Sequence, residues 1–472
     1  MLLTTLAQAA DATPGIRVGS EGFLDIFNGY IVIFAVAFVV TLAVTPLMRK
    51  FAIDNGIIDR PDDPRKAHSL PVAYLGGIGV FIGLIAALGF AYLAPHLPDT
   101  MFYFHESEKF GYRFLETQLL VPPAVLLGIV AITITGLLDD VLGLDPRLKI
   151  VGQLIAAAAL ALEDFGVRLA EGLIMPFARA ANLPMIEITS PTTDVTRESL
   201  GFIIDLPAGA FGGTLEIDLI YWIGTAIIAI FVLGGCNASN LIDGLDGLLS
   251  GVTAIAAFGL LIIAVHLASV DDGPRDASRI ILCMALMGAC LGFLPHNFNP
   301  ATIFLGDCGS LLLGYLTIVI VLSLGDTGQT HLVVAGLIVY SIPIIDTCLA
   351  IVRRKMAGKR MSAADDQHLH HMLKRRLGVR GAVMALYLLG ASFAAIGVWL
   401  SSGPIRLVFT VAMVLFGFVG VTAIKFARRA AIEAQVAKLA TPASIRPPTA
   451  ATTPPAVSSG AGAYTSSPDA SP

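Results

Sequence analysis

Long apolar stretches separated by short polar ones dominate the hydrophobic pattern of the chain. A stretch of about 17 to 22 apolar residues is long enough to cross a lipid bilayer as a helix. We expect a helix at each of eleven stretches: residues 29–47, 75–95, 118–137, 147–162, 217–234, 247–267, 279–294, 309–323, 331–352, 381–400 and 404–424. The pattern therefore predicts an all-α polytopic membrane protein with about eleven transmembrane helices.

The composition agrees with a membrane protein and gives no case for nucleic-acid binding. Hydrophobic residues make up 56% of the 472 positions and charged residues only 14%, whereas a soluble domain has about a quarter charged residues. The formal net charge of −5 is small for this length. The five cysteines lie within or beside apolar stretches and lack metal-site spacing, so we expect unpaired thiols.

The lysines and arginines predict which loops face the cytoplasm, because cytoplasmic loops carry the excess of positive charge. Loops that follow odd-numbered stretches, together with the C-terminal tail, hold 21 of the 30 basic residues. We therefore expect these loops inside the cell and the N-terminus outside. Losing or gaining one of the two weaker stretches, 147–162 and 279–294, would invert the sides of everything after it.

The same pattern divides the chain into three regions. Residues 1–27 are expected to form an extracytoplasmic tail, and residues 28–425 a transmembrane domain. Residues 426–472 become rich in Pro, Ala, Ser and Thr, which is typical of a largely disordered cytoplasmic tail. The one long extracytoplasmic connection, about 163–216, alternates short apolar runs towards its end and predicts a small β-hairpin or irregular cap.

Four polar residues lie between two long apolar runs, at three-residue intervals: Asn237, Asn240, Asp243 and Asp246. We call them the polar stripe. The three-residue step keeps the four side chains near one helical face. Carboxylates beside membrane-spanning helices are costly without a cation, a partner or water, so we interpret the stripe as a candidate functional site. A polar helix cap followed by a glycine turn is the alternative, but it does not explain the whole period.

Four further polar motifs fall in loops on the same predicted side of the membrane. They are Lys66 and His68 before Gly76-Gly77, the pair Asp139-Asp140, the segment 304–310 with Phe304 and Asp307, and the group His368, His370 and His371. Each alone has a plainer explanation as a solvated helix end, a turn aspartate or an interfacial loop. Their location on one face favours a shared pocket.

The residue types in these motifs indicate phosphoryl transfer to an acceptor supplied from the bilayer. There are several acids and several cations but no nucleophilic serine or cysteine arrangement. In such chemistry a metal neutralises developing charge while the protein aligns the attacking and leaving oxygens. Carboxylates suit magnesium, and the histidine group is better placed to contact phosphate oxygens than to bind zinc.

Two alternatives come from other functional classes. An ion-coupled transporter would place its acids near the bilayer midplane, in helices that break there. An aspartate-rich prenyltransferase would release pyrophosphate, and both the histidine group and the period of the polar stripe argue against it.

In their order along the chain, the motifs resemble the polyprenyl-phosphate N-acetylhexosamine-1-phosphate transferases, a family with WecA-type and MraY-type members. The matching residues are Asp139-Asp140, the run Asn-x-x-Asn-x-x-Asp-Gly-x-Asp-Gly from Asn237, Phe-x-Gly-Asp-x-Gly-Ser from Phe304, and His-x-His-His from His368. The resemblance implies a multi-pass protein of the bacterial inner membrane with a cytoplasmic active site. It also implies a reaction that requires Mg²⁺, or alternatively Mn²⁺, in which undecaprenyl phosphate attacks a UDP-sugar and UMP is released.

The resemblance further implies a role for each motif residue. Asp307 would be the principal metal ligand, Asp140 would lie close to the metal and the diphosphate, and Asp139 would be the candidate base or lipid-phosphate contact. The other residues would bind substrate: Asn240 and Asp243, with Asn237, at the diphosphate; Gly244, Leu245, Asp246 and Phe304 at the uridine; Lys66, His68, His368, His370 and His371 at phosphate or sugar groups. A phosphate monoester with a second pKa near 6 is already largely deprotonated at neutral pH, so alignment and metal charge are expected to contribute more than proton removal.

The histidine motif separates the two branches of the family. MraY-type enzymes carry three consecutive histidines before an acidic residue, whereas the run from His368 to His371 is interrupted by Leu369 and followed by Met372. This resembles the WecA type and implies N-acetylglucosamine as the donor sugar, in the first membrane step of a cell-envelope polysaccharide such as the O antigen of lipopolysaccharide. N-acetylgalactosamine, a deoxy amino sugar, an MraY-type donor and a homodimer stay open.

Overall fold

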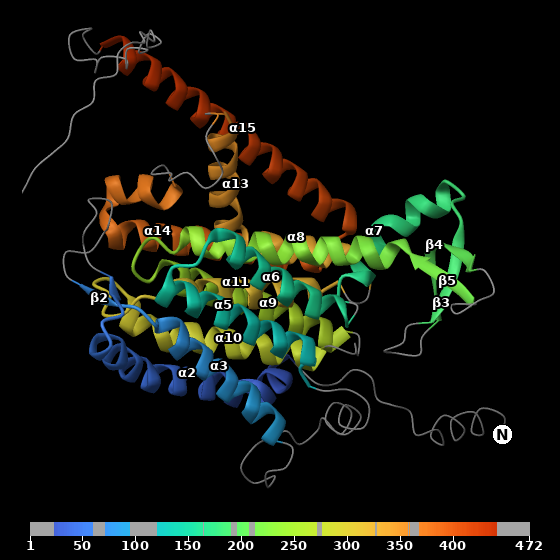
Figure 1. Cartoon of the computed structure of the whole chain (residues 1–472), viewed down its shortest axis with the longest axis horizontal. Helices are drawn as coiled ribbons and strands as arrows, with labels where there is room; N and C mark the ends of the chain where they lie inside the picture. Colours follow the sequence, from blue (N-terminus) through green and yellow to red (C-terminus); the bar gives the residue numbers. More distant parts are fainter. Residues whose placement is uncertain are drawn as a thin grey trace, which may run out of the picture.

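Apolar helices form most of the computed structural model, and a small β-sheet projects from one end of the bundle (Figure 1). The structure describes residues 23–59, 71–94, 120–163, 165–189, 196–206, 213–270, 276–325, 328–356, 358 and 368–440. Residues 1–22 and 441–472, which hold most of the two expected tails, lie outside this set, as do Lys66 and His68.

The described helices coincide with all eleven apolar stretches. Their bounds are α2 (Phe23–Asp54), α3 (Gly76–Leu93), α5 (Pro123–Leu142), α6 (Pro146–Ala161), α7 (Val167–Ala180), α8 (Leu219–Ile242), α9 (Leu248–Val270), α10 (Asp276–Asn297), α11 (Gly306–Ser323), α12 (Thr330–Val339), α13 (Ser341–Met356), α14 (Leu369–Ser401) and α15 (Ile405–Ala440). Nine helices of the described residues are long and apolar enough to cross a membrane, or ten if one bent pair counts as a span. The chain is a mostly helical, polytopic membrane protein, as its pattern predicts.

Two of the eleven stretches differ in form from a simple span. The fourth stretch is the 16-residue helix α6, which packs against α5 and α8. The ninth breaks into α12 and α13, which meet at 82°, and α13 then rises out of the bundle towards α15 (Figure 1). At the C-terminal end α15 continues to Ala440, beyond the expected domain boundary at residue 425.

The helices differ in how far the protein itself buries them. In α10 and α11, 89% of the most apolar window is buried inside the protein, against 22% in α2 and 11% in α15. A helix that is apolar all round and buried belongs to the core of the bundle. The apolar side chains that α14 and α15 leave exposed, such as Leu388, Met413 and Phe416, are suited to lipid.

The long connection before α8 contains more structure than the expected hairpin. Helix α7 comes first, followed by the antiparallel sheet β3-β4-β5, formed by Met185–Thr189, Thr196–Leu206 and Gly213–Asp218. The register pairs Phe202 with Ile217. Asp218 then accepts a hydrogen bond from Tyr221 N at 3.0 Å and caps the start of α8.

A second, smaller pairing joins the segment before α3 to the segment before α11. Strands β1 (Ile58–Asp59) and β2 (Val72–Ala73) are antiparallel, and Ala73 also forms a parallel bridge with Ile303. Gly76 N and Gly77 N then donate to the carbonyl oxygens of Phe304 and Leu305, both at 2.9 Å. These bonds fix the position at which α11 begins.

Glycines let α3 and α5 approach the first turn of α11 closely. A Cβ on Gly77 would lie 2.2 Å from Gly309 N, and a Cβ on Gly136 would lie 2.4 Å from the Cα of Cys308. Both neighbours are backbone atoms, which cannot swing away as a flexible side chain can. The packing therefore requires residues without a side chain at these two positions.

We expect Gly77→Ala to destabilise the protein by about 1–3 kcal/mol, the usual cost of inserting a methyl group into a filled core. Thermal unfolding of detergent-purified protein would measure this loss. Gly89→Ala is the matched control, because it lies on the same helix and a Cβ there would meet no atom within 4 Å. Equal unfolding temperatures for the two variants would contradict the close packing of α3 on α11.

Candidate active site

Three carboxylates meet where the end of α5 reaches the start of α11. Asp139 and Asp140 lie in the last turn of α5, and Asp307 lies in the first turn of α11. One oxygen from each of the three lies within 4.8 Å of the others. The packing of α5 on α11 thus brings together two motifs that are far apart in the sequence.

Asp140 links the two helices directly. Its Oδ1 accepts a hydrogen bond from Asp307 N at 2.7 Å, and its Oδ2 accepts one from Cys308 N at 3.0 Å. Backbone N–H groups in the first turn of a helix have no partner within the helix, and the helix dipole favours a negative charge there. Asp140 therefore serves as the N-terminal cap of α11 from another helix.

Lys149 of α6 completes the cluster. Its Nζ lies 2.7 Å from Asp139 Oδ2 and 2.6 Å from Asp307 Oδ2, so one ammonium bridges two carboxylates. Lys149 is not among the site residues predicted from the sequence. The available signal was a basic residue shortly after two adjacent acids, on a helix that Asp145 caps.

The cluster fits a divalent metal ion. The three carboxylates carry two more formal negative charges than Lys149 neutralises. Hard carboxylate oxygens are the ligands that magnesium prefers, and the ammonium already shows that a cation can sit between Asp139 and Asp307. These residues therefore have the donor type and the charge that such an ion requires.

Two residues of the polar stripe at the end of α8 contact different helices. Asn240 Nδ2 donates to Asp307 Oδ1 at 2.8 Å and to Ser310 Oγ at 3.0 Å, which joins it to the acid cluster. Asn237 instead donates to Gln153 Oε1 at 2.9 Å. Asn240 orients the principal acid, while Asn237 connects α8 to α6.

Asp243 ends α8 as its C-terminal cap residue. Burial raises the pKa of its carboxyl to about 8, and the charges of Asp307 and Asp140 add to the rise. Near neutral pH this carboxyl can therefore carry a proton and donate a hydrogen bond. A protonated carboxyl can contact a phosphate oxygen as a donor.

Asp246 holds the loop that follows α10. Its Oδ2 accepts hydrogen bonds from Asn299 Nδ2 at 2.8 Å and from Ala301 N at 3.0 Å. Next to it Gly247, with φ of 76°, donates to Asn297 Oδ1 at 3.0 Å. These bonds fix one loop against another and do not involve the acid cluster.

The two remaining residues expected at the uridine differ in exposure. Leu245 is buried in the core, with 4% of its surface exposed. Phe304 is partly buried and meets the ring of Tyr74 edge-on at 6.2 Å.

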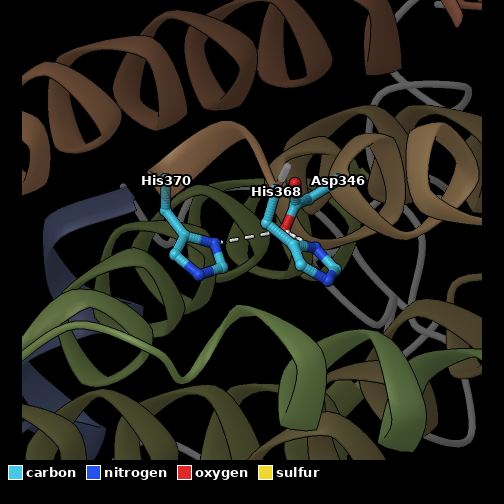
Figure 2. Close-up of side chains that lie close together, drawn as sticks. All are labelled: Asp346, His368 and His370. Atoms are coloured by element: carbon cyan, nitrogen blue, oxygen red, sulfur yellow. Dashed lines mark hydrogen bonds and ion pairs between the residues drawn. The ribbon is translucent and has the colours of Figure 1, made fainter. Parts of the chain in front are cut away.

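The histidine group is built around a buried aspartate that sequence reasoning missed. Asp346 Oδ2 lies 3.0 Å from His368 Nδ1 and 3.2 Å from His370 Nδ1 (Figure 2). The ring of His371 lies beside that of His370, with centroids 4.3 Å apart. Asp346 falls in an apolar stretch, and an acid within such a stretch was the signal that could have identified it.

The histidine group lies against the end of the polar stripe. A Cβ on Gly244 would be 2.6 Å from His370 Nε2, so the imidazole occupies the space that a side chain would fill. The structure therefore brings α14 next to the turn between α8 and α9. Lys66 and His68, the other predicted cations of the site, are outside the described residues.

Comparisons with known proteins agree on one family. Residues 122–325 match the family described as Glycosyl transferase family 4. The chain is 30% identical over 395 residues to a probable undecaprenyl-phosphate N-acetylglucosaminyl 1-phosphate transferase of Bacillus subtilis (strain 168), covering 83% of this chain and 91% of that protein. It is also 30% identical over 371 residues to the decaprenyl-phosphate N-acetylglucosaminephosphotransferase of Mycobacterium tuberculosis (strain ATCC 25618 / H37Rv), covering 75% and 78%.

A second group of relatives carries a different name. The chain is 29% identical over 359 residues to the phospho-N-acetylmuramoyl-pentapeptide-transferase of Bacillus cytotoxicus, covering 73% of this chain and 90% of that protein. The matched family segment contains the acid cluster, Lys149 and the polar stripe.

Proposed function

We propose, from the premise that the chain belongs to glycosyl transferase family 4, that it transfers N-acetylglucosamine 1-phosphate from UDP-N-acetylglucosamine to undecaprenyl phosphate. The products are a lipid-diphosphate sugar and UMP. The observation that carries the proposal is the meeting of three acids and Lys149 at one end of apolar helices. At such a position a phosphate anchored in the bilayer can reach a water-soluble nucleotide.

In this proposal Asp307 and Asp140 are the residues that would hold Mg²⁺. When bound, the ion would supply positive charge that offsets the negative charge of the diphosphate. Asn240 and Lys149 keep the Asp307 carboxylate in one orientation through contacts of 2.8 and 2.6 Å. Held in this way, the carboxylate needs little rearrangement when the substrates arrive.

Asp139 aligns the site in this proposal and does not act mainly as a base. Its Oδ1 accepts a hydrogen bond from Leu144 N at 2.9 Å, and its Oδ2 is paired with Lys149 at 2.7 Å. The attacking phosphate is already largely deprotonated at neutral pH, because its second pKa is near 6. A residue that fixes Lys149 between two acids contributes more than one that removes an unneeded proton.

The remaining predicted residues bind the UDP-sugar in this proposal. Asn240 and Asp243, with Asn237 behind them, order the diphosphate; Gly244, Leu245, Asp246 and Phe304 frame the uridine; and Lys66, His68, His368, His370 and His371 contact phosphate or sugar groups. We place the site on the cytoplasmic face. Supporting this side, α13 ends in Arg353, Arg354 and Lys355, and cytoplasmic segments carry the excess of basic residues.

The arrangement of the acids argues against an ion-coupled transporter. Such a protein places its ionisable residues near the bilayer midplane. Here Asp139 and Asp140 lie in the last turn of one helix and Asp307 in the first turn of another. This is a site at a helix end, facing one side of the membrane.

The donor sugar can be tested with purified protein in detergent, supplied with undecaprenyl phosphate, Mg²⁺ and one UDP-sugar at a time. We expect UMP release with UDP-N-acetylglucosamine and little with UDP-N-acetylgalactosamine or UDP-glucose. Release only with the UDP-N-acetylmuramoyl-pentapeptide would favour the second candidate, which the relative in Bacillus cytotoxicus supports. No UMP with any donor would contradict the proposed function. Pyrophosphate release when an isoprenoid diphosphate and an aromatic acceptor are supplied instead would indicate a prenyltransferase.

A further inference from the structure

We propose that Asp346 is a positioning residue that sets the orientation of His368 and His370 for contact with the phosphates of the UDP-sugar. This inference rests on the proposed function. Asp346 lies on α13, just after the bend between α12 and α13, and the histidines lie at the start of α14. Figure 2 shows the carboxylate facing both rings.

The burial of the group explains why its contacts matter. Asp346 and His370 are each 1% exposed, and His368 is 5% exposed. A buried carboxylate is costly unless donors satisfy its oxygens. Here one oxygen faces two imidazole Nδ1 atoms, at 3.0 and 3.2 Å, and the other accepts from Leu369 N at 2.7 Å. Among the described residues, these three hydrogen-bonding groups come from one short segment, His368 to His370.

The contact with the shared carboxylate oxygen engages Nδ1 of each imidazole and leaves Nε2 to contact another group. An imidazole whose Nδ1–H donates to a carboxylate is held in one tautomer and one ring orientation. Because the Nδ1 atoms of His368 and His370 both face Asp346, their Nε2 atoms point elsewhere. The stacked rings, inclined by only 20°, reflect this common orientation.

The Nε2 atom of His370 points towards the proposed substrate pocket. It would contact a Cβ on Gly244 at 2.6 Å, and Gly244 lies four residues after Asn240, which donates to Asp307 of the acid cluster at 2.8 Å. Both oxygens of Asp346 already face hydrogen-bonding groups, His368 and His370 on one side and the Leu369 N–H on the other, so neither is left for a nucleotide. Asp346 therefore acts through His370, which presents Nε2 beside the end of the polar stripe.

The same three side chains are also close enough together to hold a metal ion. The hydrogen-bonded arrangement accounts for their positions more simply. One Asp346 oxygen accepts from the Leu369 N–H, and the two Nδ1 atoms lie at ordinary hydrogen-bond distance from the other oxygen. The zinc content of the purified protein distinguishes a metal site from this hydrogen-bonded arrangement.

The test is Asp346→Asn, assayed by UMP release with purified, folded protein. Asparagine keeps the shape of the side chain but has one acceptor oxygen, so it cannot accept from Leu369 N and from the imidazoles together. We expect the KM for UDP-N-acetylglucosamine to rise about tenfold or more, which corresponds to losing one hydrogen bond to a charged group. The KM for undecaprenyl phosphate is expected to stay unchanged, because the histidines serve the nucleotide-sugar.

Thr347→Val is the matched control on the same helix. The Thr347 hydroxyl is buried but makes no hydrogen bond within the described part of the chain, so the substitution keeps the shape and removes nothing that the site uses. A wild-type protein that releases UMP, together with Asp346→Asn kinetics equal to those of Thr347→Val, would overturn the positioning role alone. Absence of UMP release by the wild type would instead refute the proposed function and the inference with it.

A double-mutant cycle separates positioning from a general structural role. If Asp346 acts in part through His370, Asp346→Asn combined with His370→Gln raises the KM by less than the product of the two separate fold-changes. Fully additive effects would contradict the inference. The inference would also be contradicted if the purified wild type contained one zinc ion per chain and the Asp346→Asn variant contained none. Should Asp346→Asn fail to fold, Asp346→Glu takes its place, because it keeps the carboxylate and changes its distance from the two imidazoles.

Discussion

Replacing Asp307 with asparagine is expected to lower the rate of UMP release by about a thousandfold while the protein stays folded. The amide has nearly the shape of the carboxylate, so the packing at the start of α11 is kept. It lacks the negative charge that pairs with Lys149 at 2.6 Å and that would hold a divalent ion together with Asp140. The substitution therefore removes stabilisation of the charge that develops during phosphoryl transfer.

The measurement is UMP release at saturating substrate, with the thermal unfolding temperature as a check on folding. Asp145→Asn is the matched control, because it makes the same change at a nearby aspartate that caps α6. Asparagine caps helices about as well as aspartate, so both activity and stability are expected to stay close to wild type. An Asp307→Asn protein with activity near that of Asp145→Asn would show that the acid cluster is not the catalytic site.

Asp140→Ala is expected to reduce activity by about a hundredfold or more and also to lower stability by about 1–2 kcal/mol. The second effect distinguishes it from Asp307→Asn. Asp140 accepts hydrogen bonds from Asp307 N and Cys308 N, and alanine leaves both donors of the first turn of α11 without this acceptor.

Thermal unfolding and UMP release, measured on the same preparation, test both parts of this prediction. Asp140→Asn is the informative companion, because an amide oxygen can accept one of the two N–H groups. We expect it to recover part of the stability and little of the activity. An Asp140→Ala protein that unfolds at the wild-type temperature would contradict the capping role.

Much of the fold could be predicted because apolar length and basic residues are properties of single segments. Each apolar stretch contains a helix, and the bilayer requirement for internal hydrogen bonding makes this inference strong. Apolar length does not reveal whether a stretch forms one helix or two. The break between α12 and α13 has one local signal, Pro343 in the first turn of α13, a position that suits a residue without an N–H group.

The candidate site could be predicted in part. Adjacency drew attention to Asp139 and Asp140, and the glycine-rich turn before α11 drew attention to Asp307. The structure brings the three together. Lys149 and Asp346 were missed because their significance depends on partners that only tertiary packing supplies. Lys149 pairs with Asp307 across 158 positions of sequence, and no pattern within one segment contains that information.

The polar stripe shows the limit of reasoning from helical period. Equal spacing favoured a common role for Asn237 and Asn240, yet the end of α8 packs against two different helices, α6 and α11. Asn240 faces α11 and Asn237 faces α6. Periodicity identifies a face of a helix, whereas the packing of its neighbours decides what each residue on that face contacts.

The most direct test of the account follows the β-phosphorus of the donor. Purified protein would receive UDP-N-acetylglucosamine labelled with ³²P in the β-phosphate, together with undecaprenyl phosphate and Mg²⁺. Transfer of a sugar phosphate carries the label into the organic-soluble lipid and leaves unlabelled UMP in the aqueous phase. Label that remains in water as UDP, with sugar alone on the lipid, would contradict the account.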